Sequence, residues 1–158
     1  MIKLKKDNSK NFDLETIDYF FRNREAFCVE VEDVKCLREK VLKGECIKRI
    51  NSERGEKFYY IMDNDKIVGE LWTYRYKEPI EELSIRIFDE YQRMGYATAS
   101  IKNYIQNYRG ENMSLIANCK DINPVHNGIR KMLLKCGFKY LEKENIYYEN
   151  KNPLLMND

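Results

Sequence analysis

The change of hydrophobic pattern after residue 57 restricts the fold more than any other feature of this sequence. Two segments rich in aromatic and β-branched residues, 58–62 and 66–72, flank the short acidic segment 63–65. Such a pattern predicts two strands joined in a hairpin. A third segment, 83–87, in which apolar and polar residues alternate, follows Pro79, which cannot donate a main-chain hydrogen bond within a sheet. The sequence therefore predicts a meander of three antiparallel strands.

The spacing of apolar residues on either side of the meander completes the expected order of elements. Before it we expect a strand over 1–5, a helix over 14–21 after the cap Asp13, and a helix over 34–42, capped within 31–33 and ended by Gly44. After it we expect helices over 98–108 and 129–136 and strands over 113–117, 138–141 and 146–148. Segment 45–55 is compatible with either a helix or a strand. This order indicates an α+β (mixed α/β) fold in which helices pack on a sheet.

Length and composition indicate one compact domain. The chain has 158 residues, 43% hydrophobic and 34% charged, with no repeat and no linker rich in Gly, Ser or Pro, so we expect residues 1–158 to form a single domain. The 28 basic and 26 acidic residues are interspersed, which gives no long-range attraction to nucleic acid. No apolar run is long enough for a signal peptide or a membrane span, so we expect a cytoplasmic protein without a membrane partner.

The five cysteines carry no metal-site or disulfide pattern. They form no C-x-x-C pair and are odd in number, so neither a zinc site nor a complete disulfide set is expected. A reducing compartment fits this usage best. Cys119 and Cys136 fit small buried side chains better than nucleophiles, because no basic partner is visible for either.

The loop from Gln92 to Ala97 has the composition of a phosphate-binding site. It follows a predicted strand and opens a predicted helix, where free N–H groups and the helix dipole attract anions. Gly95 has no Cβ to obstruct an anion, Ala97 is small, and Arg93 adds a positive charge. Neither the G-x-G-x-x-G dinucleotide fingerprint nor the Lys-Ser/Thr pair of a nucleotide-triphosphate loop is present.

The same loop, Gln92-Arg93-Met94-Gly95-Tyr96-Ala97, matches the Q/R-x-x-G-x-G/A signature of the GNAT superfamily of N-acetyltransferases. The segment 123–138, which ends in Gly137-Phe138, resembles the segment that closes the catalytic core in that family. The resemblance covers residues 58–148. It implies a mostly antiparallel sheet with a splayed central strand pair and about four flanking helices, with acetyl-CoA as co-substrate and no metal ion. It is also compatible with a homodimer.

The resemblance implies which residues bind the cofactor. The strand before the loop would pair through its main chain with the pantetheine arm, which places Ile87 and Asp89 along the cofactor. The loop and the first turn of the helix would surround the pyrophosphate through main-chain amides and side chains, and Asn123 would contact the pantetheine. The pyrophosphate-binding residues implied in this way are Gln92, Arg93, Met94, Gly95, Tyr96, Ala97 and Thr98.

The resemblance implies a base but leaves the acid open. Acetylation requires a neutral amine, so the site must remove a proton from an ammonium group and return one to the leaving thiolate. Glu81, eleven positions before Gln92, occupies the slot of the base in this family, with Glu82 beside it; exposed positions after Pro79 explain both residues equally well. His126 stands where many members carry an asparagine and can titrate near neutrality, although a lone loop histidine is more often a surface residue.

The usual proton-donor tyrosine of the family is replaced by Leu133 in this chain. We therefore expect an N-acetyltransferase that moves an acetyl group from acetyl-CoA to a primary amine, of a small molecule or a protein N-terminus, by direct attack in a ternary complex. Two alternatives stay open. The first is a catalytically degenerate acyl-CoA-binding sensor or interaction module, and the second is an interaction protein whose loop binds another anion. The tyrosine pairs 74/76 and 147/148 fit either an acceptor pocket or core packing.

Overall fold

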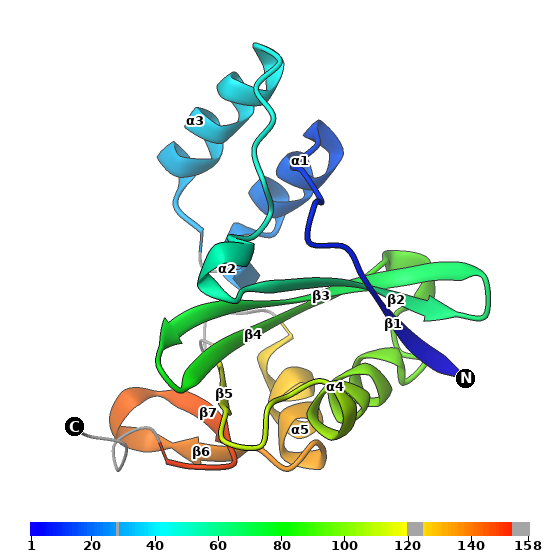
Figure 1. The fold of residues 1–158 in the computed structure, drawn as a ribbon, viewed down its shortest axis with the longest axis vertical. Coiled ribbons are helices and arrows are strands. Elements are labelled where there is room, and N and C mark those ends of the chain that lie inside the picture. The colour runs from blue at the N-terminus through cyan, green and yellow to red at the C-terminus, as the bar shows by residue number, and fades with distance from the viewer. Residues whose placement is uncertain (28, 120–124, 153–158) are drawn as a thin grey trace.

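A single seven-stranded sheet organises the computed structural model, which describes residues 1–27, 29–119 and 125–152 (Figure 1). The strands lie in the order β1-β2-β3-β4-β5-β7-β6. Neighbouring strands are antiparallel except β4 and β5, which are parallel. Their bounds are β1 (Ile2–Lys6), β2 (Lys57–Asp63), β3 (Lys66–Lys77), β4 (Ile80–Ile87), β5 (Ser114–Ala117), β6 (Lys139–Leu141) and β7 (Ile146–Glu149).

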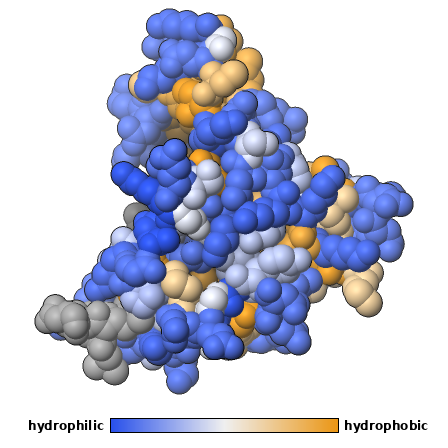
Figure 2. Space-filling view, viewed as in Figure 1, coloured by the Kyte–Doolittle hydropathy of each residue, from blue (hydrophilic) through white to orange (hydrophobic). Residues whose placement is uncertain are grey.

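Helices cover both faces of this sheet. Three of them, α1 (Leu14–Arg22), α2 (Arg24–Phe27) and α3 (Val31–Leu42), lie on one side, and α4 (Tyr96–Asn107) and α5 (His126–Lys135) lie on the other (Figure 1). Figure 2 shows a largely hydrophilic face in which apolar side chains gather around α1 and α3. Within the part of the chain that the structure describes, no helix is long and apolar enough to cross a membrane.

Local chemistry explains several of these boundaries. Asp13 caps α1, because its Oδ1 accepts a hydrogen bond of 2.7 Å from the main-chain N–H of Thr16. Asn64 turns the chain between β2 and β3 with a φ of 53°, a left-handed value that Asn tolerates better than most residues. Gly137 has a φ of 91° immediately after α5, where a helix commonly ends in this conformation.

Two local predictions were wrong or incomplete. The helix predicted over 34–42 is α3. Residues 31–33 do not cap it but form its first turn, because the N-cap is Glu30. Segment 45–55 is neither a regular helix nor a regular strand. It carries an isolated bridge between Asn11 and Lys48 and a short 3₁₀ turn over Ser52–Arg54, ended by Gly55 in the left-handed region. The short helix α2 was also not predicted.

The core consists of one cluster on each face of the sheet. The larger cluster fills the space between the sheet and α4 and α5 and includes Ile101, Leu115 and Leu133, all at most 2% exposed. The smaller cluster packs Phe58 and Trp72 against rings from α1 and α2. Burying a large apolar side chain contributes roughly 1.5–3 kcal/mol, so these two clusters fix helices to both faces of β3 and β4.

The parallel strands β4 and β5 separate after a short paired stretch. They pair only at Ile80↔Ser114, Glu81↔Leu115 and Glu82↔Ile116, whereas β4 continues to Ile87. The Phe88 N–H donates to the Val68 carbonyl of β3, and alternate residues of a strand direct their main-chain groups to opposite edges. The N–H and C=O groups of residues 83, 85 and 87 therefore lie on the edge of β4 that β5 leaves open. This confirms the predicted fold class and its splayed strand pair.

Candidate active site

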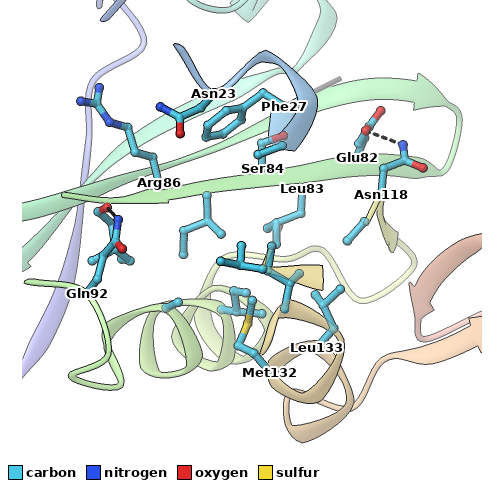
Figure 3. Close-up of a pocket in the computed structure, with 18 of the residues that line it drawn as sticks. Asn23, Phe27, Glu82, Leu83, Ser84, Arg86, Gln92, Asn118, Met132 and Leu133 are labelled. Carbon is cyan, nitrogen blue, oxygen red and sulfur yellow. Dashed lines mark hydrogen bonds between the residues drawn. The ribbon is translucent and has the colours of Figure 1, made fainter. Parts of the chain in front are cut away.

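Two adjoining cavities occupy the gap between β4 and β5. The first, of about 370 Å³, lies between α1 and α2 on one side and α4 and α5 on the other (Figure 3). The second, of about 710 Å³, extends from it toward the N-termini of α4 and α5. Both are lined by Ile87, Gln92 and Ala97, so the two cavities share a wall and lie side by side. We call the first cavity the acceptor end and the second cavity the phosphate end.

The phosphate end is formed largely by main chain at the start of α4. Gly95 is the N-cap of this helix, with a φ of 82° and no side-chain cap, so the free N–H groups of the first turn are available to a ligand. A Cβ built on Gly95 would meet no atom within 4 Å, which shows open space next to the helix terminus. Arg93, Tyr96 and Thr98 also line this cavity. Free N–H groups at the positive end of a helix dipole, beside a guanidinium, can bind a phosphate.

Gln92 and Tyr96 hold this loop in place. The Gln92 side-chain N–H₂ donates to the Ile87 carbonyl at 3.2 Å and to an Asp89 carboxylate oxygen at 3.0 Å. The Tyr96 hydroxyl donates to Asp63 at 2.8 Å, which ties the start of α4 to the turn between β2 and β3. This hydrogen bond, together with desolvation, raises the pKa of Tyr96 above its ordinary value.

Not every residue expected at the cofactor lines the cavities. Ile87, Gln92, Arg93, Gly95, Tyr96, Ala97 and Thr98 do. Met94 is 62% exposed and belongs to neither cavity, and Asp89 contacts Gln92 from an exposed position. Asn123 lies outside the described residues. The open edge of β4 adds Ile85, which lines the acceptor end and which sequence reasoning missed.

The neighbouring glutamates of β4 lie on opposite faces of the strand. Glu81 is 2% exposed and does not line either cavity. Its Oε1 lies 3.1 Å from the Lys57 Nζ, and its Oε2 accepts a hydrogen bond of 3.1 Å from the Tyr104 hydroxyl. Burial, supported by the nearby Glu81 carboxylate, raises the pKa of Tyr104 well above its ordinary value. Glu81 is thus part of a buried ion pair beneath the sheet, away from the space where a ligand can bind.

Glu82 lines the acceptor end of the cavity, on the side of α1 and α2 (Figure 3). Its Oε1 accepts a hydrogen bond of 2.7 Å from the Asn118 side-chain N–H₂. Glu82 is also the last residue of β4 that pairs with β5, opposite Ile116. The carboxylate therefore lies at the point where the two strands begin to separate, at the closed end of the gap.

The walls of the acceptor end differ in polarity. Glu82, Ser84 and Arg86 lie on the face of β4 toward α1 and α2, whereas Leu83 faces Met132 and Leu133 of α5 (Figure 3). Tyr19 of α1, Asn23 between the two helices, and Ala26 and Phe27 of α2 lie opposite this face, so that side of the cavity combines polar and apolar groups. Sequence reasoning missed these α1 and α2 residues, together with Arg86 and Asn118. The alternation of residues 82–87, polar at even and apolar at odd positions, was a usable signal for the β4 part.

The other candidate residues lie apart from the Glu82 carboxylate. His126 lines the phosphate end at the start of α5 and is not among the residues around Glu82. Tyr147 is 1% exposed in the core, and Tyr76 is 60% exposed. Leu133, which stands in the tyrosine slot, is buried and has no proton to donate. Burial raises the pKa of the Cys136 thiol, which makes it a poor nucleophile. Among the residues that the structure describes, no group of three or more His, Cys, Asp or Glu side chains could hold a metal ion.

Comparison with known proteins identifies the class to which this fold and site belong. The model of the acetyltransferase (GNAT) family matches residues 12–138, which is most of the chain. The chain therefore belongs to the GNAT family. The match spans both ends of the cavity, from α1 to the end of α5.

Individual similar proteins are more distant. The Campylobacter jejuni N-acetyltransferase PseH, solved in complex with acetyl coenzyme A, has a TM-score of 0.54 and 17% identity, with 94% of this chain and 96% of that chain covered. A mutant form of the spermidine/spermine N-acetyltransferase SpeG from Vibrio cholerae has a TM-score of 0.54 and 16% identity, with coverage of 94% and 93%. At these identities the likeness shows a shared fold.

One curated protein is more similar in sequence over a shorter range. It is named "Probable nicotinate-nucleotide adenylyltransferase", from Pelagibacter ubique, and is 31% identical over 102 residues. The match covers 63% of this chain and 55% of that protein, so the chain spans about half the length of this curated relative.

Proposed function

We propose that this protein transfers the acetyl group of acetyl-CoA to a primary amine, of a small molecule or a protein N-terminus, by direct attack in a ternary complex. The observation that carries this proposal is the pair of adjoining cavities that reach from the uncapped N-terminus of α4 to the Glu82 carboxylate along the open edge of β4. We also propose that residues 1–158 work as one catalytic unit, because the cavity walls come from α1 and α2 as well as from β4, β5, α4 and α5. Acetyl-CoA as donor is supported by its presence in the structure of PseH.

Acetyl-CoA would bind along this cavity with its pyrophosphate at the phosphate end. The N–H groups at the start of α4 and the Arg93 guanidinium would hold the phosphate oxygens. The pantetheine amides would pair with the main-chain groups of Ile85 and Ile87, in the way that a further strand pairs with an open edge. Residues 83–87 span roughly 13 Å at about 3.3 Å per residue, which is long enough to align an extended arm. The thioester would then lie near Glu82.

Glu82 would act as the general base in this arrangement. Because Asn118 donates to Oε1, the second oxygen of the carboxylate is available to accept a proton from the ammonium group of the acceptor. The neutral amine then attacks the thioester carbonyl, so that the C–N bond forms and the C–S bond breaks as the tetrahedral intermediate collapses. The remaining extra proton on nitrogen leaves with the thiolate, which becomes the free thiol of CoA. This scheme requires no tyrosine at the Leu133 position.

The neighbouring Glu81 would have a structural role in this scheme. Its two oxygens contact Lys57 and Tyr104, and its side chain points away from the cavity. His126 would contribute to the phosphate end and not to proton transfer, since it belongs to the cavity wall at the start of α5. We therefore assign the base to Glu82 and not to Glu81, the neighbouring residue that the family resemblance implies.

Leu133 favours one alternative function, a module that binds acyl-CoA without turnover. Release of CoA thiol from acetyl-CoA, measured with a panel of primary amines and with a control lacking amine, separates the two. Amine-dependent thiol release supports the enzyme. Tight acetyl-CoA binding by calorimetry without thiol release for any amine supports the module. If phosphate raises the melting temperature and acetyl-CoA does not, both functions are contradicted.

A further inference from the structure

The polar face of β4 carries a buried positive charge that the chemistry proposed above does not use. Arg86 is 8% exposed and lies on the same face of the strand as Glu82, in the wall of the acceptor end (Figure 3). Its guanidinium lies 3.6 Å from the ring centroid of Tyr19 in α1. Arg86 is therefore held between the sheet and the helix that covers the acceptor end.

Arg86 is incompletely paired within the protein. Its closest carboxylate among the described residues is that of Glu70, at the long distance of 3.9 Å. The same Glu70 oxygen is already 3.3 Å from Arg49, which is 1% exposed at its side chain. The Nε of Arg86 is buried and has no hydrogen-bond partner. Two buried guanidinium groups thus share one buried carboxylate, which leaves one uncompensated positive charge.

The two arginines differ in what surrounds them. Arg49 is enclosed by four aromatic rings, those of Phe12, Phe20, Phe58 and Trp72, at 4.9 to 5.3 Å. Ring faces stabilise a buried cation, and Glu70 is nearer to Arg49 than to Arg86. Arg86 has fewer rings around it, those of Tyr19 at 3.6 Å and Phe88 at 5.0 Å, and unlike Arg49 it lines the acceptor end. The surplus charge of the cluster is therefore presented to whatever occupies the acceptor end.

The other charged groups near Arg86 do not neutralise it. Arg22 and Asp89 both influence the Tyr19 hydroxyl, and both are exposed to solvent, where their charges are screened. A buried charge is costly unless it is paired, and an arginine pairs well with the oxygens of a carboxylate or a phosphate. An anionic group on a ligand would supply the missing partner.

We propose that the acceptor carries an anionic oxygen group, a carboxylate or a phosphate, that binds Arg86 while its primary amine lies at Glu82. The inference rests on the proposed function, because the same cavity holds both groups. Glu82 and Arg86 are four residues apart on β4, so their Cα atoms are roughly 13 Å apart at about 3.3 Å per residue. Both side chains can lean toward the ligand, and the acceptor is therefore a zwitterion whose amine and anion are well separated. Polyamines and other purely cationic amines would be poor acceptors.

The test compares acceptors that differ only in the anionic group. We would measure kcat/KM for 6-aminohexanoate against hexylamine, and for glucosamine 6-phosphate against glucosamine, so that carboxylate and phosphate are separated. A charge-assisted hydrogen bond is worth about 1.5–3 kcal/mol, so at least one anionic acceptor should exceed its neutral partner by roughly 10-fold to 100-fold. The opposite result, in which hexylamine or a diamine of the same length is preferred, overturns the proposal.

Variants show whether Arg86 is the cause of the preference. Arg86→Gln should reduce the ratio of the two kcat/KM values to within about twofold, whereas Arg22→Gln, which removes an exposed charge near the same site, should retain it. A preference that persists in Arg86→Gln contradicts the proposal. Because Glu70 stays paired with Arg49, we expect Arg86→Gln to fold, and its melting temperature checks this. If Arg86→Gln does not fold, the comparison of anionic and neutral acceptors with the wild-type protein still tests the proposal.

A binding measurement separates this inference from the proposed function. Calorimetry of 6-aminohexanoate and of glucosamine 6-phosphate into protein saturated with CoA requires no turnover. Binding that is lost in Arg86→Gln, without thiol release from acetyl-CoA, would refute the acetyltransferase and retain the anion site. Thiol release with neutral amines only would support the acetyltransferase and refute the anion site at Arg86.

Discussion

The two ends of the cavity are constructed from different parts of the polypeptide. The phosphate end is organised by one short stretch, the loop and the uncapped first turn of α4, with Gly95 in a left-handed conformation, and the start of α5 completes its wall. The acceptor end is lined by residues of α1, α2, β4, β5, α4 and α5. Main-chain N–H groups are the same in every sequence, so the phosphate end can bind a constant group such as pyrophosphate. The side chains of the acceptor end change with every substitution, and it is there that we propose specificity and proton transfer to reside.

The largest expected effect falls on the acceptor end. We predict that Glu82→Gln lowers kcat for amine acetylation by roughly 10³-fold, because removal of a general base typically costs 10²-fold to 10⁴-fold. The Kd for acetyl-CoA should change by less than about threefold, since Glu82 is remote from the phosphate end. Steady-state kinetics and calorimetry on the same preparation measure both quantities. A kcat within tenfold of wild type would exclude Glu82 as the base.

The next effect falls on the phosphate end. We predict that Gly95→Glu weakens acetyl-CoA binding about 100-fold, because a carboxylate would occupy the open space where the pyrophosphate binds and a side chain is strained at a φ of 82°. Calorimetry gives the Kd. Gly95→Asn is the matched control, since Asn tolerates positive φ and adds no charge, and it should lose much less affinity. Equal losses in the two variants would show that bulk, not charge, is responsible.

A smaller effect is expected for the other glutamate of β4. We predict that Glu81→Gln lowers the free energy of unfolding by about 2 kcal/mol, less than the loss for a fully buried ion pair, because Lys57 is 23% exposed and can reach water. Urea denaturation measures this change. The kcat of the folded variant should fall far less than that of Glu82→Gln. If Glu81→Gln were the more inactive of the two, the assignment of the two faces of β4 would be reversed.

The smallest effect concerns the helix that covers the acceptor end. We predict that Asp13→Ala, which removes the cap of α1, lowers the free energy of unfolding by about 1 kcal/mol. Asp13→Asn should stay near wild type, because Asn caps equally well. Partial burial of the Asp13 carboxylate raises its pKa, but the hydrogen bonds that it accepts from Thr16 lower the pKa by more. The pKa of Asp13 is therefore lowered in the folded protein. The Asp13 contribution is therefore present above the ordinary carboxyl pKa and is lost as the pH falls through the lower folded value. A pH titration of wild-type and Asp13→Asn stability checks the sign.

The difference between the two ends also explains how much of the site could be predicted from sequence. The phosphate end depends on consecutive residues, so its motif predicted Gly95, Ala97 and their neighbours at the cavity. Aromatic and β-branched residues predicted β2 and β3, and alternation predicted β4, although β3 is buried on both faces. The acceptor end depends on which distant residues the fold brings together, such as Phe27 and Asn118, and no local pattern specifies that.

The case of the two glutamates shows a second limit. The family's base slot, eleven positions before Gln92, indicated Glu81, and the structure places that residue on β4, which begins three residues before the predicted strand. Side chains of adjacent residues in a strand point to opposite faces of the sheet. A sequence match that is shifted by one residue therefore indicates a side chain on the other face. The partner that holds Glu81 in the core, Lys57, lies on β2, and a sequence pattern around Glu81 could not reveal it.

A crystal structure of the protein with acetyl-CoA tests the central claim most directly. The account predicts the pyrophosphate oxygens within about 2.7–3.2 Å of the first N–H groups of α4, and the thioester carbonyl on the open edge of β4 beside Glu82 and Asn118. A structure in which the pyrophosphate lies away from Gly95, or in which the acetyl group approaches Glu81 and not Glu82, would contradict it.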